Sequence, residues 1–454
     1  MSLPLRKRFP RLVIPLEDAL RYSPLVHRAA ARLLALKASF KSARSAPAAR
    51  LQALTQAYQA AWDGPLLSWI RKLLAPAMPP AQPSLYGEEP WSRLKVGWSR
   101  YQRPGEPTRI TRSVILKAPD ERTGERGVLL MTFEYNWLRL LSGVDMRDFA
   151  QRFNLVFSTS WSPTDYNILS LALEKIPDSE PVFVQACNYS EISKLNAFHP
   201  RIRSLGTLPC DWLNPAFYEP LPTGERPYDI LMLSNWAPFK RHWQFFQALA
   251  HMRKDLRIAL IGQKESGYTQ EDIRKLARSF GAKQDFTIFE SIPPDEVTRL
   301  QCSARTSVIF SRREGCCVAA VESLMAGSPL ALLHDAHVGP RAYINEKTGV
   351  LLRPGQIAEQ LSRFVEEAGN YTPREWATEK ISCHSSIHQL NGLLRTAAQE
   401  AGRPWTHDLL MPCWRPHPTI MHNPAHGVLR PVYTELHRRY PDVFAPDLME
   451  ISHR

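Results

Sequence analysis

Between residues 227 and 366, short apolar runs alternate with longer segments whose apolar residues recur at helical spacing. The runs predict β-strands and the longer segments predict helices. We expect strands at 228–233, 256–262, 286–289, 306–310 and 329–333, and helices at 243–252, 270–280, 294–303 and 317–325. This alternation indicates a parallel sheet with right-handed crossovers. Ligands bind such sheets at the carboxyl ends of the strands.

A second α/β pattern precedes this one. Apolar runs at 113–118 and 127–133 flank a turn-like segment, which predicts a hairpin. Further strands are expected at 155–158, 181–186 and 203–209, with helices at 137–153, at 165–175 and from 190. Residues 16–76 read as helical, and prolines from Pro76 to Pro83 mark a linker. The predicted organisation is therefore a helical extension (1–80), two α/β domains (81–222 and 223–366) and a helical and coiled tail (367–454).

Charge is unevenly placed along the chain. The formal net charge is +13, and residues 1–80 hold thirteen Lys or Arg against three Asp or Glu. Such a basic flank indicates either an anionic partner (acidic lipid, acidic glycan or nucleic acid) or a solvated surface. Within it, the segment from Pro65 to Pro76 carries a Trp and two cations among leucines. That pattern fits an interfacial membrane helix or an ordinary packing helix.

Other features bear on location. No apolar run reaches the roughly 18 residues of a membrane span. The chain has seven cysteines, and Cys316 is adjacent to Cys317. An odd number with an adjacent pair favours reduced thiols, so we expect a cytoplasmic protein.

The candidate chemistry lies between the strand at 306–310 and the next helix. Gly315 permits a tight turn, and the amides and dipole of the helix start form an anion site that a diphosphate fits. Glu314 and Glu322 are eight residues apart and can face one crevice, where carboxylates accept hydrogen bonds from sugar hydroxyls. Two glutamates at this spacing also occur on solvated helices, so the spacing alone does not distinguish a binding site from an exposed helix face.

The segment from Glu314 to Glu322 resembles the E-x7-E motif of retaining GT-B glycosyltransferases, the large family often called family 4. Three further segments are similar to motifs of that family in the same order. Residues 208–217 resemble "IPNGVD…F", residues 231–241 resemble "VGRL-x-x-x-KG", and residues 344–355 resemble "TGLLV-PG". The resemblance covers residues 203–366.

The resemblance implies an α/β, GT-B-like fold of two Rossmann-like domains, here with the helical N-terminal extension and a C-terminal tail that we expect to cross back to the first domain. It implies retaining transfer of a sugar from a UDP-, GDP- or ADP-sugar to a glycan or lipid-linked acceptor, as in polysaccharide biosynthesis. No cofactor and no metal are expected; the chain lacks the Asp-x-Asp motif of metal-dependent transferases. The implied catalytic residues are Glu314, beside the donor sugar, and Lys240, on the diphosphate. The implied nucleotide-sugar-binding residues are Ser234, Asn235, Arg241, Gly315, Cys316, Cys317 and Glu322, the last holding the ribose hydroxyls.

The chain departs from the family pattern at several points. Asn235 stands where the family has a phosphate-binding arginine, and Arg241 or Arg313 are candidates to replace that charge. Arg341 stands in place of a family glutamate, and the first α/β domain lacks the expected Gly-rich loop. These departures motivate an alternative, a non-catalytic GT-B-like protein that binds a glycan, lipid or protein.

Two remaining expectations concern the rest of the chain. Glu134 is either an acceptor contact or base, or a carboxylate at a helix start. Residues 1–80 are a candidate for peripheral contact with anionic membrane at the inner face of the plasma membrane, with a solvated surface as the alternative. We expect no nucleic-acid partner because no binding motif accompanies the charge.

Overall fold

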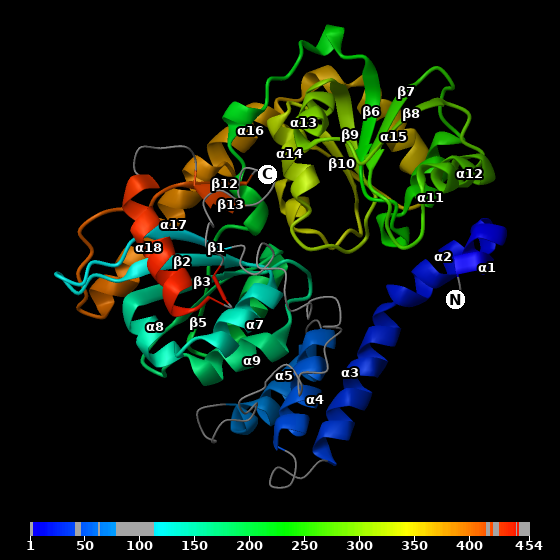
Figure 1. Ribbon diagram of the computed structural model, residues 1–454. Helices are drawn as coiled ribbons and strands as arrows, with labels where there is room; N and C mark the ends of the chain where they lie inside the picture. The colour runs from blue at the N-terminus through cyan, green and yellow to red at the C-terminus, as the bar shows by residue number, and fades with distance from the viewer. Residues whose placement is uncertain are drawn as a thin grey trace. The chain divides into compact units, whose positions relative to one another are not determined.

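The computed structural model describes residues 3–40, 47–61, 64–78, 113–414, 418–420, 426–441 and 443–444. The chain forms two compact units that do not follow chain order (Figure 1). Unit 1 holds residues 1–23 and 213–385, and unit 2 holds residues 24–212 and 386–454. Contacts therefore divide both the N-terminal extension and the C-terminal tail between the two units. Of the linker expected from Pro76 to Pro83, residues 76–78 are described, with Pro76 in a short 3-10 helix (Ala75–Ala77), and the rest lies outside the described residues.

Unit 1 is built on a six-stranded parallel sheet with the order β11-β10-β9-β6-β7-β8. Counted from β6, this is the order 3-2-1-4-5-6 of a dinucleotide-binding Rossmann fold. The order reverses between β6 and β9, which places the topological switch point there. The five expected strands are confirmed, and β11 completes the edge. The strands are β6 (Tyr228–Leu233), β7 (Arg257–Gly262), β8 (Asp285–Glu290), β9 (Ala304–Ile309), β10 (Leu330–Leu333) and β11 (Gly349–Leu352).

Helices cover both faces of this sheet. Figure 1 shows α13 and α14 on one side and α11, α12 and α15 on the other. Local sequence sets their ends: Thr269 and Asp272 form a capping box at the start of α12, and Gly281 ends it in the left-handed conformation. The helices are α11 (His242–Leu249), α12 (Gln270–Phe280), α13 (Pro294–Cys302), α14 (Val318–Met325), α15 (Ile357–Glu366) and α16 (Pro373–Lys380). The four helices expected here are confirmed.

The described residues before position 113 form five α-helices, and the helical character expected for residues 16–76 is confirmed over the part of that range that the structure describes. α1 (Leu3–Arg8) and α2 (Pro10–Arg21) belong to unit 1, where α2 buries Val13 and Ile14 and contacts α12. α3 (Pro24–Ser39), α4 (Pro47–Ala60) and α5 (Gly64–Leu74) belong to unit 2. There, α4 lies between α3 and α9. Among the described helices, none combines the length and the hydropathy needed to cross a bilayer.

Unit 2 contains a five-stranded sheet in the order β1-β2-β3-β4-β5. β1 and β2 pair antiparallel, which confirms the expected hairpin, and the remaining pairs are parallel. Two expectations differ from the structure. The helix at 137–153 is two helices, because Asp145 caps a new one by accepting a hydrogen bond from the Arg147 amide. The strand expected at 203–209 ends at Ser204, and a 3-10 helix begins at Pro209. The elements are β1 (Ser113–Lys117), β2 (Gly127–Thr132), α7 (Glu134–Gly143), α8 (Met146–Arg152), β3 (Phe153–Ser158), α9 (Tyr166–Lys175), β4 (Val182–Gln185), α10 (Ile192–Phe198) and β5 (Ile202–Ser204).

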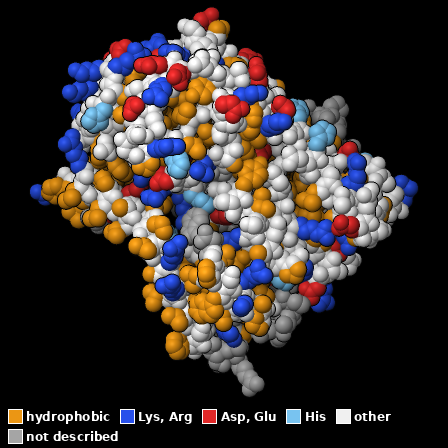
Figure 2. Space-filling model, turned by 180° about the vertical axis from the view of Figure 1, so that it is seen from behind, with side chains coloured by type: hydrophobic (Ala, Val, Ile, Leu, Met, Phe, Trp, Pro, Cys, Tyr) orange, Lys and Arg blue, Asp and Glu red, His pale blue; other side chains and the backbone are white. Residues whose placement is uncertain are grey.

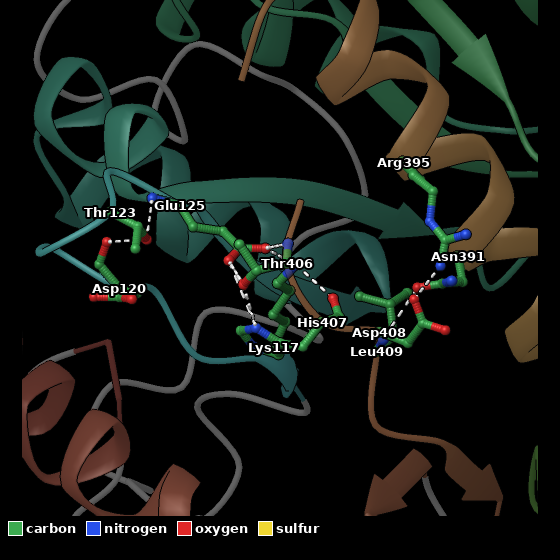
Figure 3. A network of polar contacts seen from close by, with 10 residues as sticks. All are labelled: Lys117, Asp120, Thr123, Glu125, Asn391, Arg395, Thr406, His407, Asp408 and Leu409. Atoms are coloured by element: carbon green, nitrogen blue, oxygen red, sulfur yellow. Dashed lines mark hydrogen bonds and ion pairs between the residues drawn. The ribbon is translucent and has the colours of Figure 1, made fainter. Parts of the chain in front are cut away.

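The end of the chain returns to this hairpin, as expected. After α17 (Cys383–Glu400), the chain passes over β1 and β2 around a buried ion pair (Figure 3). Lys117 pairs with Glu125, donates to the His407 carbonyl at 2.8 Å and lies 3.6 Å from the ring centre of Trp405. Thr406 donates its backbone amide to Glu125 at 2.8 Å. The tail then forms β12 (Pro412–Trp414), β13 (Pro418–Ile420) and α18 (His426–Arg439).

Candidate functional site

The candidate site lies at the switch point of unit 1, where the loops after β6 and β9 begin. Ser234 follows β6 and Ser311 lies just beyond β9. Both side chains are buried, and neither hydroxyl oxygen has a hydrogen-bond partner among the described residues. Gly262 lets the first loop lie across the end of β7, because a Cβ there would stand 2.4 Å from the Ser234 carbonyl oxygen. Since buried polar groups normally have partners, this edge suits a polar ligand.

Lys240 and Glu314, the two expected catalytic residues, meet at this edge. Lys240 Nζ donates to Glu314 Oε1 at 2.7 Å, and their side chains are only 15% and 8% exposed. Burial acts to lower the pKa of Lys240, but the facing carboxylate of Glu314 outweighs it, so the pKa lies above its usual value. The ammonium is therefore charged at neutral pH, next to the start of α14.

The turn that carries Glu314 has an unusual backbone. Cys317, directly before α14, has φ 50° and ψ 64°, a left-handed conformation that costs a non-glycine residue about 1 kcal/mol or more. The turn is fixed from the opposite side, since the Glu314 amide donates to the His337 carbonyl at 3.3 Å. Gly315, Cys316 and Cys317 are buried in it. The six described cysteines, these two included, are buried thiols.

His242 is a site residue that the sequence analysis missed. It is the first residue of α11, directly after Lys240 and Arg241, and it is buried. Burial first, and then the charge of Lys240, lower its pKa to about 3, so the ring is neutral at physiological pH. One ring nitrogen bonds the Ser234 backbone, whereas Nε2 has no partner in the described part of the chain. In the sequence, only its position directly after Lys240 and Arg241 indicates that His242 belongs to the site.

Glu322 lies on α14 but does not join the Lys240–Glu314 pair. It accepts a hydrogen bond from Gln301 Nε2 at 3.3 Å. Burial raises the pKa of Glu322 to about 6, and the hydrogen bond from Gln301 offsets only part of that effect. Asn235, at the position of the family's arginine, is exposed and donates to Glu265 at 3.1 Å.

Arg241 is a buried cation between Lys240 and His242. Its backbone is left-handed, with φ 57° and ψ 37°, and its guanidinium donates to Asp18 of α2 at 2.6 Å. Both side chains are under 10% exposed. Nε and Nη1 of Arg241 have no hydrogen-bond partner within the described ranges. Two arginines are candidates to replace the missing charge. Arg241 has a buried guanidinium with unused donors, and Arg313 forms a β-bridge with His337 through its backbone. Arg341 donates its Nε to the His334 carbonyl at 3.1 Å.

Glu134 occupies a comparable place in unit 2, directly after β2. Its carboxylate accepts hydrogen bonds from the amide and the hydroxyl of Ser160. Burial raises the pKa of Glu134 despite these bonds. Phe133 before it has a φ of 64°, a strained value for a bulky residue. Both interpretations of Glu134, acceptor-side group and helix-start carboxylate, fit this geometry.

A family match covers the sheet that carries the site. Residues 216–378 match the family model described as Glycosyl transferases group 1. This segment is therefore similar to the glycosyl transferases group 1 family. The match confirms the resemblance found in the motifs, and it spans all six strands of unit 1 together with Lys240, Glu314 and Glu322. Two α/β units with largely parallel sheets also fit the expected pair of Rossmann-like domains.

Three of the solved structures similar to the chain resemble it in fold alone. Sucrose-phosphate synthase from Thermosynechococcus elongatus is 16% identical over 60% of this chain and 74% of that one, with a TM-score of 0.45. TarM, solved from S. aureus, is 15% identical over 59% and 54%, with a TM-score of 0.46. The lipopolysaccharide outer core galactosyltransferase WaaB is 16% identical over 61% and 76%, with a TM-score of 0.44. This chain thus spans about half the length of TarM. No curated protein matches the sequence.

Proposed function

We propose that the protein is a retaining glycosyltransferase that moves a sugar from a nucleotide-diphosphate-sugar donor to a glycan or lipid-linked acceptor. The observation that carries this proposal is the 2.7 Å contact of Lys240 with Glu314 at the switch point of a group 1 domain. The two residues come from the loops after β6 and β9, and ligands of open parallel sheets bind between such loops.

In this proposal, each group has a role that its surroundings permit. Lys240, held charged by Glu314, binds the donor diphosphate and stabilises the charge that develops on it as the sugar departs. The start of α14 adds the positive end of its dipole, and the backbone of Gly315, Cys316 and Cys317 approaches sugar and phosphate. Glu314 accepts hydrogen bonds from the donor sugar. Arg241 supplies the charge that Asn235 lacks.

The nucleoside end is assigned to the other carboxylate. Glu322 binds the ribose hydroxyls through its acceptor oxygens. Ser234 and the neutral His242 line the same edge with a hydroxyl and an unused ring nitrogen, which suit polar atoms of the donor. Departure and attack on one face of the sugar, guided by the donor phosphate, give retention. The proposal requires no metal and no cofactor besides the donor.

Thermal unfolding with UDP-, GDP- and ADP-sugars tests the donor site. We expect one nucleotide class to raise the Tm, and Lys240→Ala and Glu322→Ala to abolish that rise. Lys254→Ala, an exposed lysine of the same unit, is the matched control and is expected to respond like the wild type. No stabilisation at millimolar concentrations of any of the three would refute the proposed function. The anomeric configuration of the product, read by NMR, tests retention.

The alternative, a non-catalytic GT-B-like protein that binds a glycan, lipid or protein, is favoured by one observation. Asn235 pairs with Glu265, so that position offers no cation for phosphate. Stabilisation by a nucleotide without hydrolysis of the donor and without transfer to any tested acceptor would support this alternative.

We also propose a cytoplasmic location, a part in polysaccharide biosynthesis and peripheral contact with anionic membrane.

A further inference from the structure

Most of the exposed large apolar side chains among the described residues belong to the N-terminal helices. Of thirteen such side chains, ten fall between residues 5 and 40. Soluble proteins rarely expose apolar groups in so dense a series unless the surface binds something. Figure 2 shows hydrophobic side chains together with Lys and Arg over these helices, which lie to the left in that view.

In unit 1, the apolar residues form one stripe along α1 and α2. Leu12, Leu16 and Leu20 of α2 are four residues apart and therefore share one helix face, and Leu12 is 72% exposed. Leu5 of α1 and Phe9, between the two helices, continue the exposed series. α2 contacts α12 of unit 1 and buries Val13 and Ile14, whereas the apolar residues named below stay exposed. The stripe therefore points away from the domain that α2 contacts. It consists of Leu5, Phe9, Leu12, Leu16 and Leu20.

In unit 2, α3 repeats this arrangement on its own. Its small residues Ala31, Ala35 and Ala38 are buried, and α3 packs on α4. Its large residues face outward instead, with Leu25 74% and Leu33 68% exposed, followed by Leu36 and Phe40. A helix that buries alanine and exposes leucine has its hydrophobic face available for another surface.

Charge identifies that surface. Residues 3–40 hold eight Lys or Arg and only two acidic residues, Glu17 and Asp18. Both acidic side chains are engaged within unit 1, Glu17 with Arg6 and Asp18 with Arg241. The basic residues of α3, which are Arg28, Arg32 and Lys37, are all exposed. Apolar stripes flanked by cations, with their two acidic neighbours already held in ion pairs, match a bilayer with anionic headgroups.

We propose that the outward faces of α1–α2 and of α3 each dock on the surface of an anionic membrane. The segment from Pro65 to Pro76, the earlier candidate, forms α5, which packs on α4 and buries Ile70 and Leu74 while Trp69 stays 39% exposed. Docking on two faces gives each unit its own membrane contact. The inference rests on the peripheral membrane contact proposed above and names the faces that make it. It does not require sugar transfer, although it suits a lipid-linked acceptor.

Flotation of the full chain with vesicles tests the proposal. We expect the protein to float with vesicles of equal parts phosphatidylcholine and phosphatidylglycerol at low salt, and much less with pure phosphatidylcholine or at high salt. L12Q/L16Q/L20Q in unit 1 and L33Q/L36Q in unit 2 should each lower the partition coefficient about tenfold or more. Leu221→Gln, an exposed leucine outside these helices, is the matched control and should float like the wild type.

Several results would overturn the proposal. One is a wild type that does not float; another is flotation that both multiple variants leave unchanged. A third is light scattering that shows a dimer without lipid which the variants dissociate, because a second copy would then cover the stripes. Near-UV circular dichroism confirms that each variant is folded. Nucleotide binding measured on the same samples without vesicles separates a failure of docking from a failure of the donor site.

Discussion

Removing the charge of Lys240 tests the ion pair and its proposed role together. The Lys240 and Glu314 side chains are 15% and 8% exposed and meet at 2.7 Å. Loss of one partner from a pair this buried leaves the other charge desolvated, which costs about 3–5 kcal/mol. Lys240→Met is therefore expected to lower the free energy of unfolding by about 3 kcal/mol. In a unit of this size, that corresponds to a Tm about 6–12 °C lower.

A double-mutant cycle isolates the interaction between the two residues. Glu314→Gln alone should also destabilise, whereas K240M/E314Q should cost much less than the sum, with a coupling energy of about 2–3 kcal/mol. Urea unfolding near neutral pH measures each value, and Lys254→Met controls for loss of an exposed lysine. Additivity within about 0.5 kcal/mol would show that the residues do not interact.

The same variants separate stability from donor binding. A charge-assisted hydrogen bond to phosphate contributes about 1.5–3 kcal/mol, so Lys240→Met should weaken UDP binding roughly ten- to hundredfold in calorimetry, if UDP proves to be the nucleotide that binds. Glu314→Gln should change it only a few fold, because UDP lacks the sugar that Glu314 is proposed to contact. Equal UDP affinity for Lys240→Met and wild type would refute the assignment of Lys240 to the diphosphate.

Three further outcomes are expected. The pKa of Glu322 is raised from 4.5 to about 6, so ionisation of this carboxyl destabilises the fold fully above about pH 6 and not at all below about pH 4.5. Glu322→Gln should therefore raise the free energy of unfolding by about 2 kcal/mol at neutral pH and leave it unchanged in acid. A rise that persists in acid would contradict this. The same variant should weaken nucleotide binding. Burial acts to raise the pKa of Glu125, but hydrogen bonds from Lys117 and Thr406 outweigh it and hold it at about 2. Ionised Glu125 therefore stabilises the fold above about pH 4.5, and this contribution is lost as the pH falls toward 2. Glu125→Gln should lower the free energy of unfolding by about 3 kcal/mol in urea unfolding near neutral pH. The difference between variant and wild type should shrink between about pH 4.5 and 2. Asp18→Asn should weaken nucleotide binding several-fold, because the Arg241 guanidinium loses the carboxylate that holds it, and Asp18→Glu should restore the affinity. If calorimetry shows the same affinity for Asp18→Asn and wild type, Asp18 does not position Arg241 for binding.

Local sequence determined the elements that surround the site. Each expected strand of unit 1 was found because its residues form a short run rich in apolar and β-branched side chains, the composition typical of strands. Helix ends followed from short-range chemistry, such as the Thr269–Asp272 capping box. The motif from Glu314 to Glu322 could be placed at a strand end for the same reason. The break between α7 and α8 was missed because the Asp145 cap interrupts an otherwise continuous helical pattern.

Only the tertiary structure decided which of these groups meet. Lys240 and Glu314 are 74 residues apart, and they come together because β6 pairs with β9 across the switch point. Arg241 meets Asp18 over 223 residues through the packing of α2, which no local pattern predicts. The burial that makes His242 neutral likewise arises from surrounding elements.

The N-terminal helices illustrate the same division. Periodicity in the sequence shows which residues share a helix face, and it identified residues 16–76 as helical. It does not show which face another element covers. In α3 the alanine face packs on α4, so Leu33 and Leu36 face outward, the reverse of what hydrophobicity alone predicts. Burial is a property of the partner surface as well as of the helix, and that surface exists only once the chain has folded.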